Sequence, residues 1–257
     1  MYWPAELTGP APLVVVLHGG YGDGRQAEKN YHWDGQADTG RFVAVFPNGV
    51  GRSWNAGTCC GAAKNTDVDD VAFIRSVVAD VQRAVAIDPR RIYVAGMSNG
   101  AMMAYRMACE TTLFAAVAPV AGTILVPCSA ARPISLLAIH GEADDRVPYA
   151  GGPGKAFSVS GQARVDGPSV PADNATFRRI NDCAAPDTTR SGVVSTSVAA
   201  CPDGRTVELI SVAGAGHQWP GADPGLSLLG ISPTPSNALD ATSMIWQFFA
   251  AHPAPEH

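Results

Sequence analysis

The chain has 257 residues, of which 46% are apolar and 16% are charged, with 18 lysines and arginines and a formal net charge of −5. A disordered or coiled-coil chain would show the reverse balance, and no basic run exceeds two residues, so we expect neither nucleic acid nor anionic membrane as a partner. Since no apolar stretch reaches the roughly 18 residues of a membrane span, we expect a soluble globular protein with one domain over residues 1–257.

Short apolar segments alternate with helical patterns along the chain. Several are apolar nearly throughout, which is typical of parallel strands covered on both faces, and most end at a glycine or turn residue. We expect strands at 12–20, 41–49, 91–97, 114–122, 134–141 and 206–214. Strands that alternate with helices predict an α/β fold with a mostly parallel, doubly wound sheet.

The helical patterns lie between and after these strands. Residues 67–88 carry valines at helical spacing, with Asp67 as the expected N-cap and Asp70 in the first turn. A second helix follows Gly100, and a final amphipathic helix is expected at 236–252.

Two polar regions interrupt the alternation. Residues 150–172 are rich in Gly, Pro and Ser and predict a surface excursion, whose role as a lid the sequence leaves open. Residues 184–200 predict a second polar loop. Both follow the fifth strand, so we expect them to flank the carboxyl edge of the sheet, where loops commonly shape ligand sites.

The six cysteines (59, 60, 109, 128, 183 and 201) are an even number, which favours an exported, oxidised protein over free thiols in a cytosolic chain. Cys183 and Cys201 flank the polar loop and are the predicted pair, and the other connectivities stay open. No C-x-x-C spacing occurs, so we expect no metal site. The N-terminus "MYWPAELTGP" is no signal peptide, so an exported chain would be a mature or trimmed form.

A candidate nucleophile lies in "YVAGMSNGAMMAY", residues 93–105. Gly96-Met97-Ser98-Asn99-Gly100 fits G-x-S-x-G, in which the serine occupies a strained strand-to-helix turn and the glycines allow close backbone packing. A short β-type run precedes the pentapeptide and a helical pattern follows it. This context predicts a nucleophile rather than an incidental small polar residue.

A serine nucleophile needs a base, and in this chain order an acid precedes the histidine. His18 and His32 precede the serine, His252 and His257 lie in the tail, and His140 is late in its strand. We therefore expect His217, in the glycine-rich loop after the last strand, to be the base.

The acid should follow the fifth strand, in "LLAIHGEADDRVPY". Asp144 is our choice, ahead of Asp145, which is expected to cap the turn, and of Glu142. The oxyanion requires backbone N–H donors. We expect these from Asn99, after the nucleophile, and from Gly20 in "LHGGYGDG", with Tyr21 as the alternative.

The blocks "LVVVLHGG", "SWNAGTCCG", "DVDDVAFI", "GMSNGAMMAYRMACE", "HGEADDRVPYAGG" and "GHQWPG" resemble the bacterial esterase family of polyhydroxybutyrate depolymerases and feruloyl esterases. The resemblance runs from about residue 2 to 250 and implies an α/β-hydrolase fold without a large cap domain, secretion, disulfides and no cofactor. By motif, Ser98, Asp144 and His217 match the family's triad and Gly20 its oxyanion donor, although many depolymerases carry cysteine at that position.

The resemblance also places Trp54 and Trp219 where the family lines its cleft, with ordinary core packing as the alternative. Similar proteins carry one or two antiparallel strands before "LVVVLHG", so a trimmed N-terminus would leave an exposed sheet edge.

We therefore expect a secreted serine carboxylesterase, a monomer or homodimer, that acts on a small or oligomeric ester. Tyr21, Trp54 and Trp219 favour feruloyl esters on plant polysaccharide. Hydroxybutyrate oligomers, polyester and acetylxylan remain alternatives, although the chain lacks the linker and polymer-binding module usual for insoluble polyester. The competing class is a non-catalytic hydrolase-fold binding protein, and a serine peptidase is third.

Overall fold

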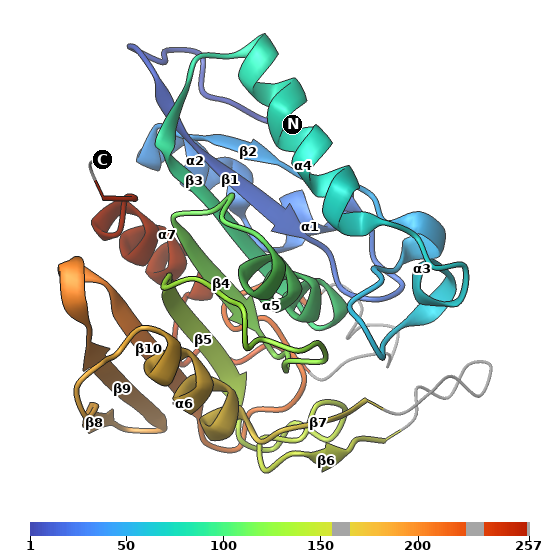
Figure 1. Ribbon diagram of the computed structural model, residues 1–257, viewed down its shortest axis with the longest axis vertical. Coiled ribbons are helices and arrows are strands. Elements are labelled where there is room, and N and C mark those ends of the chain that lie inside the picture. Colours follow the sequence, from blue (N-terminus) through green and yellow to red (C-terminus); the bar gives the residue numbers. More distant parts are fainter. Residues whose placement is uncertain (156–164, 225–233, 256–257) are drawn as a thin grey trace.

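A central eight-stranded sheet organises the computed structural model, which describes residues 1–155, 165–224 and 234–255 (Figure 1). Its strands are β1 (Ala11–Leu17), β2 (Val43–Val45), β3 (Ile87–Met97), β4 (Ala116–Val120), β5 (Ser135–Gly141), β8 (Asp187–Ser191), β9 (Val194–Ala200) and β10 (Thr206–Val212). Their order is β2-β1-β3-β4-β5-β10-β9-β8. Adjacent strands from β2 to β10 are parallel, which confirms the mostly parallel sheet, whereas the pairs β10–β9 and β9–β8 are antiparallel.

Helices cover both faces of this sheet. The helices are α1 (Gly24–Asn30), α2 (Trp33–Gly40), α3 (Gly61–Asn65), α4 (Asp70–Ala84), α5 (Asn99–Glu110), α6 (Val170–Ile180) and α7 (Ala241–Ala251). Short 3₁₀ turns occur at Val50–Arg52 and Pro202–Gly204, and β6 (Gly152–Pro153) pairs with β7 (Asp166–Gly167) in a small ribbon. In Figure 1, α4, α5 and α6 lie on one side of the sheet and α1, α2 and α7 on the other.

The all-apolar character of β1 follows from this double cover. Leu13 and Val15 belong to the core layer beneath α4, α5 and α6, whereas Val14 and Val16 belong to the layer beneath α2 and α7. All four side chains are fully buried. A strand that is packed on both faces must be apolar at every position, which is why alternation is missing from its sequence.

The polar stretch 184–200 is a β-hairpin, so the loop predicted there is wrong. β9 pairs with β10 along its whole length, from Val194 opposite Val212 to Ala200 opposite Thr206, and β8 continues the sheet outward. The free edge of β10 supplies backbone partners for this segment. Since an edge hairpin has one face in solvent, its polar side chains do not prevent strand formation.

Several element boundaries differ from those predicted. The helix expected at 67–88 is α4, which begins after Asp69, whose side chain accepts a hydrogen bond from the Ala72 amide, and it ends at Ala84. Asp67 is therefore not the cap. The following strand begins at Ile87, four residues before the predicted strand at 91–97, because its first residue pairs with Ala11.

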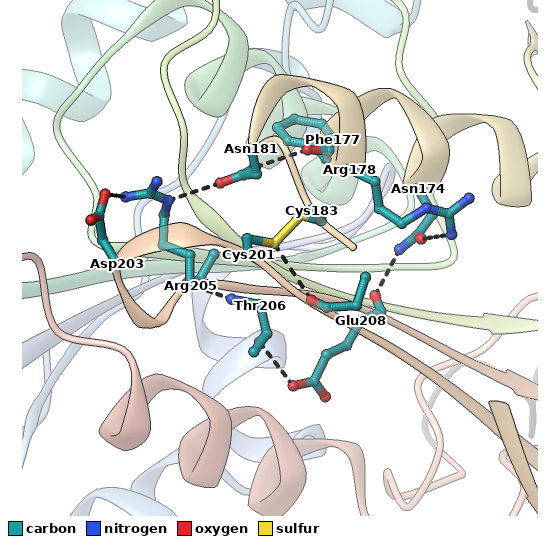
Figure 2. Close-up of a disulfide and its surroundings, with 12 residues drawn as sticks. Asn174, Phe177, Arg178, Asn181, Cys183, Cys201, Asp203, Arg205, Thr206 and Glu208 are labelled. Atoms are coloured by element: carbon teal, nitrogen blue, oxygen red, sulfur yellow. Dashed lines mark hydrogen bonds and ion pairs between the residues drawn. A yellow bond between two sulfur atoms is a disulfide. The ribbon is translucent and has the colours of Figure 1, made fainter. Parts of the chain in front are cut away.

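Three disulfides join the six cysteines. Cys183–Cys201 confirms the predicted pair, and the structure adds Cys109–Cys128 and the adjacent pair Cys59–Cys60. The Cys183–Cys201 bond links the chain just after α6 to the connection between β9 and β10 (Figure 2). Nearby, Arg205 donates to the Asn181 side chain at 3.1 Å and pairs with Asp203 at 3.1 Å, so the end of α6 is fastened to this edge of the sheet.

The opposite edge of the sheet is β2. Tyr2 pairs with Ala44 in a single antiparallel bridge, with the Tyr2 amide donating to the Ala44 carbonyl at 2.8 Å. The edge is thus partly covered rather than wholly exposed. Among the described residues, no helix has the length and apolar character required to cross a membrane.

The structure describes the 150–172 excursion only at its two ends. Whether it acts as a lid depends on residues 156–164, which lie outside the described residues. At its carboxyl end, Asp173 in α6 is 1% exposed and accepts hydrogen bonds from the Thr123 hydroxyl at 2.8 Å and the Ile124 amide at 3.3 Å. Its second oxygen, Oδ1, has no partner within the described chain. Burial raises the pKa of Asp173 to about 7, against the effect of these two hydrogen bonds.

Because the Asp173 pKa is higher in the folded than in the unfolded chain, the folded state binds more protons between about pH 4 and about pH 7. Asp173 should therefore lower the free energy of unfolding as pH rises through that window, by on the order of a few kcal/mol. In Asp173→Asn the side-chain carbonyl still accepts both hydrogen bonds, so urea melts should show a smaller decline with pH than in the parent. Asp187→Asn, an exposed control on β8, should keep the parent slope, and equal slopes in all three proteins would contradict this account.

Candidate active site

Ser98 lies in a sharp turn between β3 and α5, with φ 54° and ψ −118°. The flanking glycines make this turn possible. A Cβ on Gly96 would lie 2.3 Å from the Gly100 carbonyl oxygen, and one on Gly100 would lie 2.3 Å from the Leu17 carbonyl oxygen. The G-x-S-x-G pattern therefore reflects two steric requirements, and it leaves Ser98 at the carboxyl edge of the sheet in a strained conformation.

Three side chains from separate loops meet at this edge. The His217 Nε2 lies 2.8 Å from the Ser98 Oγ, and its Nδ1 lies 2.8 Å from the Asp144 Oδ2. Asp144 follows β5 and His217 follows β10, so the parallel arrangement of β3, β5 and β10 brings together residues up to 119 positions apart. All three are buried, with exposed fractions of 8%, 4% and 6% for Ser98, Asp144 and His217.

The Asp144 carboxylate is fully hydrogen-bonded. Its Oδ1 accepts the backbone amides of Arg146 and Val147, each at 2.8 Å, while its Oδ2 faces His217 and also His140 Nε2 at 3.3 Å. Burial alone would raise the pKa of Asp144. The charge of His217, followed by the hydrogen bonds from His140 and His217, outweighs burial and holds that pKa well below its usual range. The group is therefore an anion that can orient His217 and stabilise its protonated form.

Asp145 occupies a different environment. Its side chain is half exposed and pairs with Lys155 at 2.8 Å. The turn after Asp144 is capped by Asp144 itself rather than by Asp145. Among the carboxylates considered from sequence, the geometry thus brings only Asp144 to the histidine, with Glu142 bonded instead to the Ser211 hydroxyl at 2.7 Å.

Two residues whose backbone amides could bind an oxyanion, Gly20 and Asn99, line the same cavity as Ser98. Within the described residues, neither the Gly20 nor the Asn99 amide has a hydrogen-bond partner in the protein. A Cβ added to Gly20 would lie 3.9 Å from the Asn99 Cβ, so the two residues are neighbours, and the amino end of α5 adds its positive dipole there. The Tyr21 amide is engaged with the Arg52 carbonyl at 2.9 Å. Gly20 and Asn99 therefore remain the candidate oxyanion donors, ahead of Tyr21.

A cavity of about 140 Å³ adjoins Ser98 and these amides. Tyr21, which is 38% exposed, lies in its lining, together with Arg52 and with mostly small or apolar residues from 51–62, from α5 and from the excursion. The lining residues are Gly20, Tyr21, Gly51, Arg52, Ser53, Cys60, Gly61, Ala62, Ser98, Asn99, Met102 and Val165. Such a lining suits an acyl group of limited polarity.

Trp54 and Trp219 do not line this cavity, so their expected place at the cleft is wrong in this structure. Trp54 is 0% exposed, and its indole nitrogen donates to the His18 carbonyl at 2.9 Å. Trp219 is 2% exposed, stacks on Tyr31 and donates to the Thr242 hydroxyl at 3.0 Å. The core-packing alternative holds for both, because each indole finds a buried polar partner in the interior.

Two further buried histidines, His18 and His140, lie near the site. His140 donates to the Val147 carbonyl at 2.8 Å beside Asp144, and His18 contacts the loop that carries Gly20. Chain order excludes both as the base but says nothing about a supporting role. Among the described residues, no group of three or more His, Cys, Asp or Glu side chains could hold a metal ion.

The chain matches the family described as esterase PHB depolymerase over residues 2–151. It belongs to this family. The match contains the Ser98 turn and both candidate oxyanion residues, and it reaches past Asp144.

Individual relatives are consistent with this assignment. The chain is 34% identical over 235 residues to a putative esterase, NocK, from Nocardia uniformis subsp. tsuyamanensis, an alignment that covers 82% of this chain and 66% of the relative. It is 29% identical over 234 residues to feruloyl esterase B from Piromyces equi, covering 84% of this chain and 41% of that protein. The chain therefore spans less than two thirds of the length of these relatives.

Among solved structures, acetyl xylan esterase from Aspergillus awamori superposes with a TM-score of 0.57 at 16% sequence identity, covering 90% of this chain and 93% of that chain. At this identity the likeness establishes the fold alone. The expected α/β-hydrolase fold is confirmed.

The Asp144 geometry predicts a large loss on neutralising this group. Asp144→Asn should lower kcat for an activated ester by about four orders of magnitude, since an amide in this place no longer favours the His217 tautomer that accepts the Ser98 proton. The matched control is Asp145→Asn, next in the chain and exposed, which should retain the parent rate. Steady-state kinetics on p-nitrophenyl acetate checks both, and comparable losses in the two variants would contradict the assignment.

Proposed function

We propose that this protein is a serine carboxylesterase that hydrolyses carboxylic esters through an acyl-enzyme. The observation that carries the proposal is the hydrogen-bonded series Ser98–His217–Asp144, with distances of 2.8 Å at both contacts, beside two unengaged backbone amides. Membership of the family and similarity to a named feruloyl esterase support it.

The reaction follows from these contacts. Ser98 Oγ attacks the ester carbonyl carbon as its proton passes to His217 Nε2, and the carbonyl π electrons move onto oxygen, where the Gly20 and Asn99 amides bind the charge. His217 then protonates the leaving alkoxide, the C–O bond breaks, and the alcohol departs. Water, deprotonated by His217, attacks the acyl-Ser98 carbonyl, and collapse of the second oxyanion returns the proton to Ser98 and releases the acid. Asp144 remains ionised throughout and stabilises the imidazolium.

For the substrate we propose feruloyl esters on plant polysaccharide. The apolar lining beside Ser98, the half-exposed Tyr21 at its wall and the feruloyl esterase among the relatives support this choice. With both tryptophans buried, the aromatic contribution to the site is smaller than the sequence suggests. Short hydroxyalkanoate oligomers or polyester, and acetyl esters of xylan, are the second candidates, because the cavity is small enough to suit a compact acyl group.

We further propose that the protein acts outside the cytoplasm as a monomer or homodimer with one catalytic domain over residues 1–257. The three disulfides support an oxidising compartment. No cofactor takes part in the proposed reaction, since the proton transfers and charge stabilisation fall to groups already named.

The substrate proposal predicts a ranking of initial rates. Methyl ferulate should be hydrolysed faster, in kcat/KM, than a hydroxybutyrate trimer or methyl acetate, which shares its methanol leaving group, because the exposed Tyr21 ring adds an apolar contact for the aromatic acyl group. Acid release measured by chromatography decides between them. Ser98→Ala should abolish all three activities, and a fast trimer or acetate with slow ferulate would move the assignment to the second candidates.

The competing function is a hydrolase-fold protein that binds a ligand without turnover. Reaction with a fluorophosphonate probe separates the two. An activated Ser98 should be labelled stoichiometrically in the parent and not in Ser98→Ala, detected by intact mass. An unlabelled parent that also leaves every ester intact would support the binding protein.

A further inference from the structure

His18 is a buried residue directly after β1 that the proposed reaction does not use. Both of its ring nitrogens have partners. The Gly49 amide donates to Nε2 at 3.0 Å, and Nδ1 lies 2.8 Å from the Gly19 carbonyl oxygen. A nitrogen that accepts a hydrogen bond carries no proton, so the proton of neutral His18 belongs on Nδ1, from which it donates to Gly19.

Burial favours this neutral form. The ring is 1% exposed, and burial lowers the pKa of His18, only partly offset by the hydrogen bond to Gly19. The imidazole is therefore a neutral donor–acceptor bridge between the loop after β1 and the loop after β2.

The acceptor of this bridge belongs to the peptide unit that contains the Gly20 amide. The Gly19–Gly20 bond is trans, and in a trans peptide the C=O and N–H groups point in opposite directions. The Gly19 carbonyl is held by His18 and also by the Gly22 amide at 3.0 Å. Fixing that carbonyl directs the Gly20 N–H to the other side of the peptide plane, and Gly20 lines the cavity beside Ser98.

The same loop is joined to the second oxyanion donor through Trp54. Its indole donates to the His18 carbonyl at 2.9 Å, and its ring centroid lies 4.9 Å from that of His18. Its backbone amide donates to the Asn99 side-chain oxygen at 2.6 Å, and its carbonyl accepts from the Asn99 side-chain nitrogen at 2.9 Å. His18, Trp54 and the Asn99 side chain thus form one buried network of hydrogen bonds and ring contacts, next to the Gly20 and Asn99 backbone amides.

We propose that His18 is a positioning residue that presets the Gly20 amide for the oxyanion by holding the Gly19 carbonyl, with Trp54 coupling this loop to Asn99. The inference rests on the proposed function. His18 touches neither the ester nor the reacting atoms. Its contribution is preorganisation, since an amide that is already aimed need not be reoriented when charge develops on the substrate oxygen.

Two substitutions of His18 test the roles of the two ring nitrogens separately. His18→Asn places an amide N–H near the position of Nδ1 and can still donate to the Gly19 carbonyl, but it loses the contact with Gly49. His18→Gln extends its amide to the position of Nε2, where it can still accept from Gly49, but it loses the donor to Gly19. Both variants lose ring packing against Trp54, so both should melt at a lower temperature.

We expect His18→Gln to lower kcat by about ten- to a hundredfold, below the hundred- to thousandfold typical of deleting an oxyanion donor, with KM within about twofold of the parent. His18→Asn should stay within about threefold in kcat. A trifluoromethyl ketone, which adds Ser98 to form an oxyanion, should bind more weakly to the Gln variant by the same factor as its loss in kcat/KM. A residue that only stabilised the fold would give losses that follow the melting temperatures.

Equal kcat values in the two variants, or a loss confined to KM, would overturn the positioning role even if the parent is an active esterase. A parent that cleaves no ester and is not labelled at Ser98 would instead overturn the proposed function. If neither variant folds, the tautomer of the parent decides: ¹⁵N spectra should give a protonated Nδ1 and a bare Nε2 for His18, identified by its hydrogen-bond coupling to the Gly49 amide, and the reverse tautomer would overturn the proposal.

Discussion

The close approach of α5 to the end of β1 is the constraint on which the candidate site depends. Gly100 makes it possible, since any Cβ there would lie within 2.5 Å of the Leu17 and His18 carbonyl oxygens. This approach brings the amino end of α5, and with it the Asn99 amide, next to the loop that carries Gly20. Because Gly100 lacks a Cβ, two segments about 80 positions apart in the chain lie next to each other at the candidate oxyanion site.

The buried charge of Asp144 illustrates how the same fold supports a group that burial would otherwise neutralise. Four donors, two backbone amides and two histidines, compensate for the lost water, and the carboxylate remains an anion. Asp173 is the contrasting case. It has two donors, one oxygen without a partner within the described chain and a raised pKa. The number of donors, rather than depth alone, decides which buried acid is charged near neutral pH.

The parts predicted from sequence are those with local causes. The steric demands around Ser98 require glycine at 96 and 100, and buried parallel strands require unbroken apolar runs, so both leave a readable pattern. The β8–β9 hairpin leaves none, because its strands form on an edge that β10 supplies from elsewhere in the chain. Helix α6 did leave a signal that was missed: Ser169 caps it, accepting from Ala172, and Pro171 follows in the first turn.

Trp54 shows why motif position does not identify contact with a ligand. Its place in "SWNAG", near the nucleophile, is equally compatible with a side chain that lines the cleft and with a buried side chain that packs behind the lining residues. These two roles differ only in the direction of the Trp54 side chain. That direction depends on whether the protein interior offers a hydrogen-bond acceptor to the indole N–H. Here the His18 carbonyl is that acceptor. A residue can thus belong to the active region by motif and still influence substrate only through the backbone amides that it holds in place.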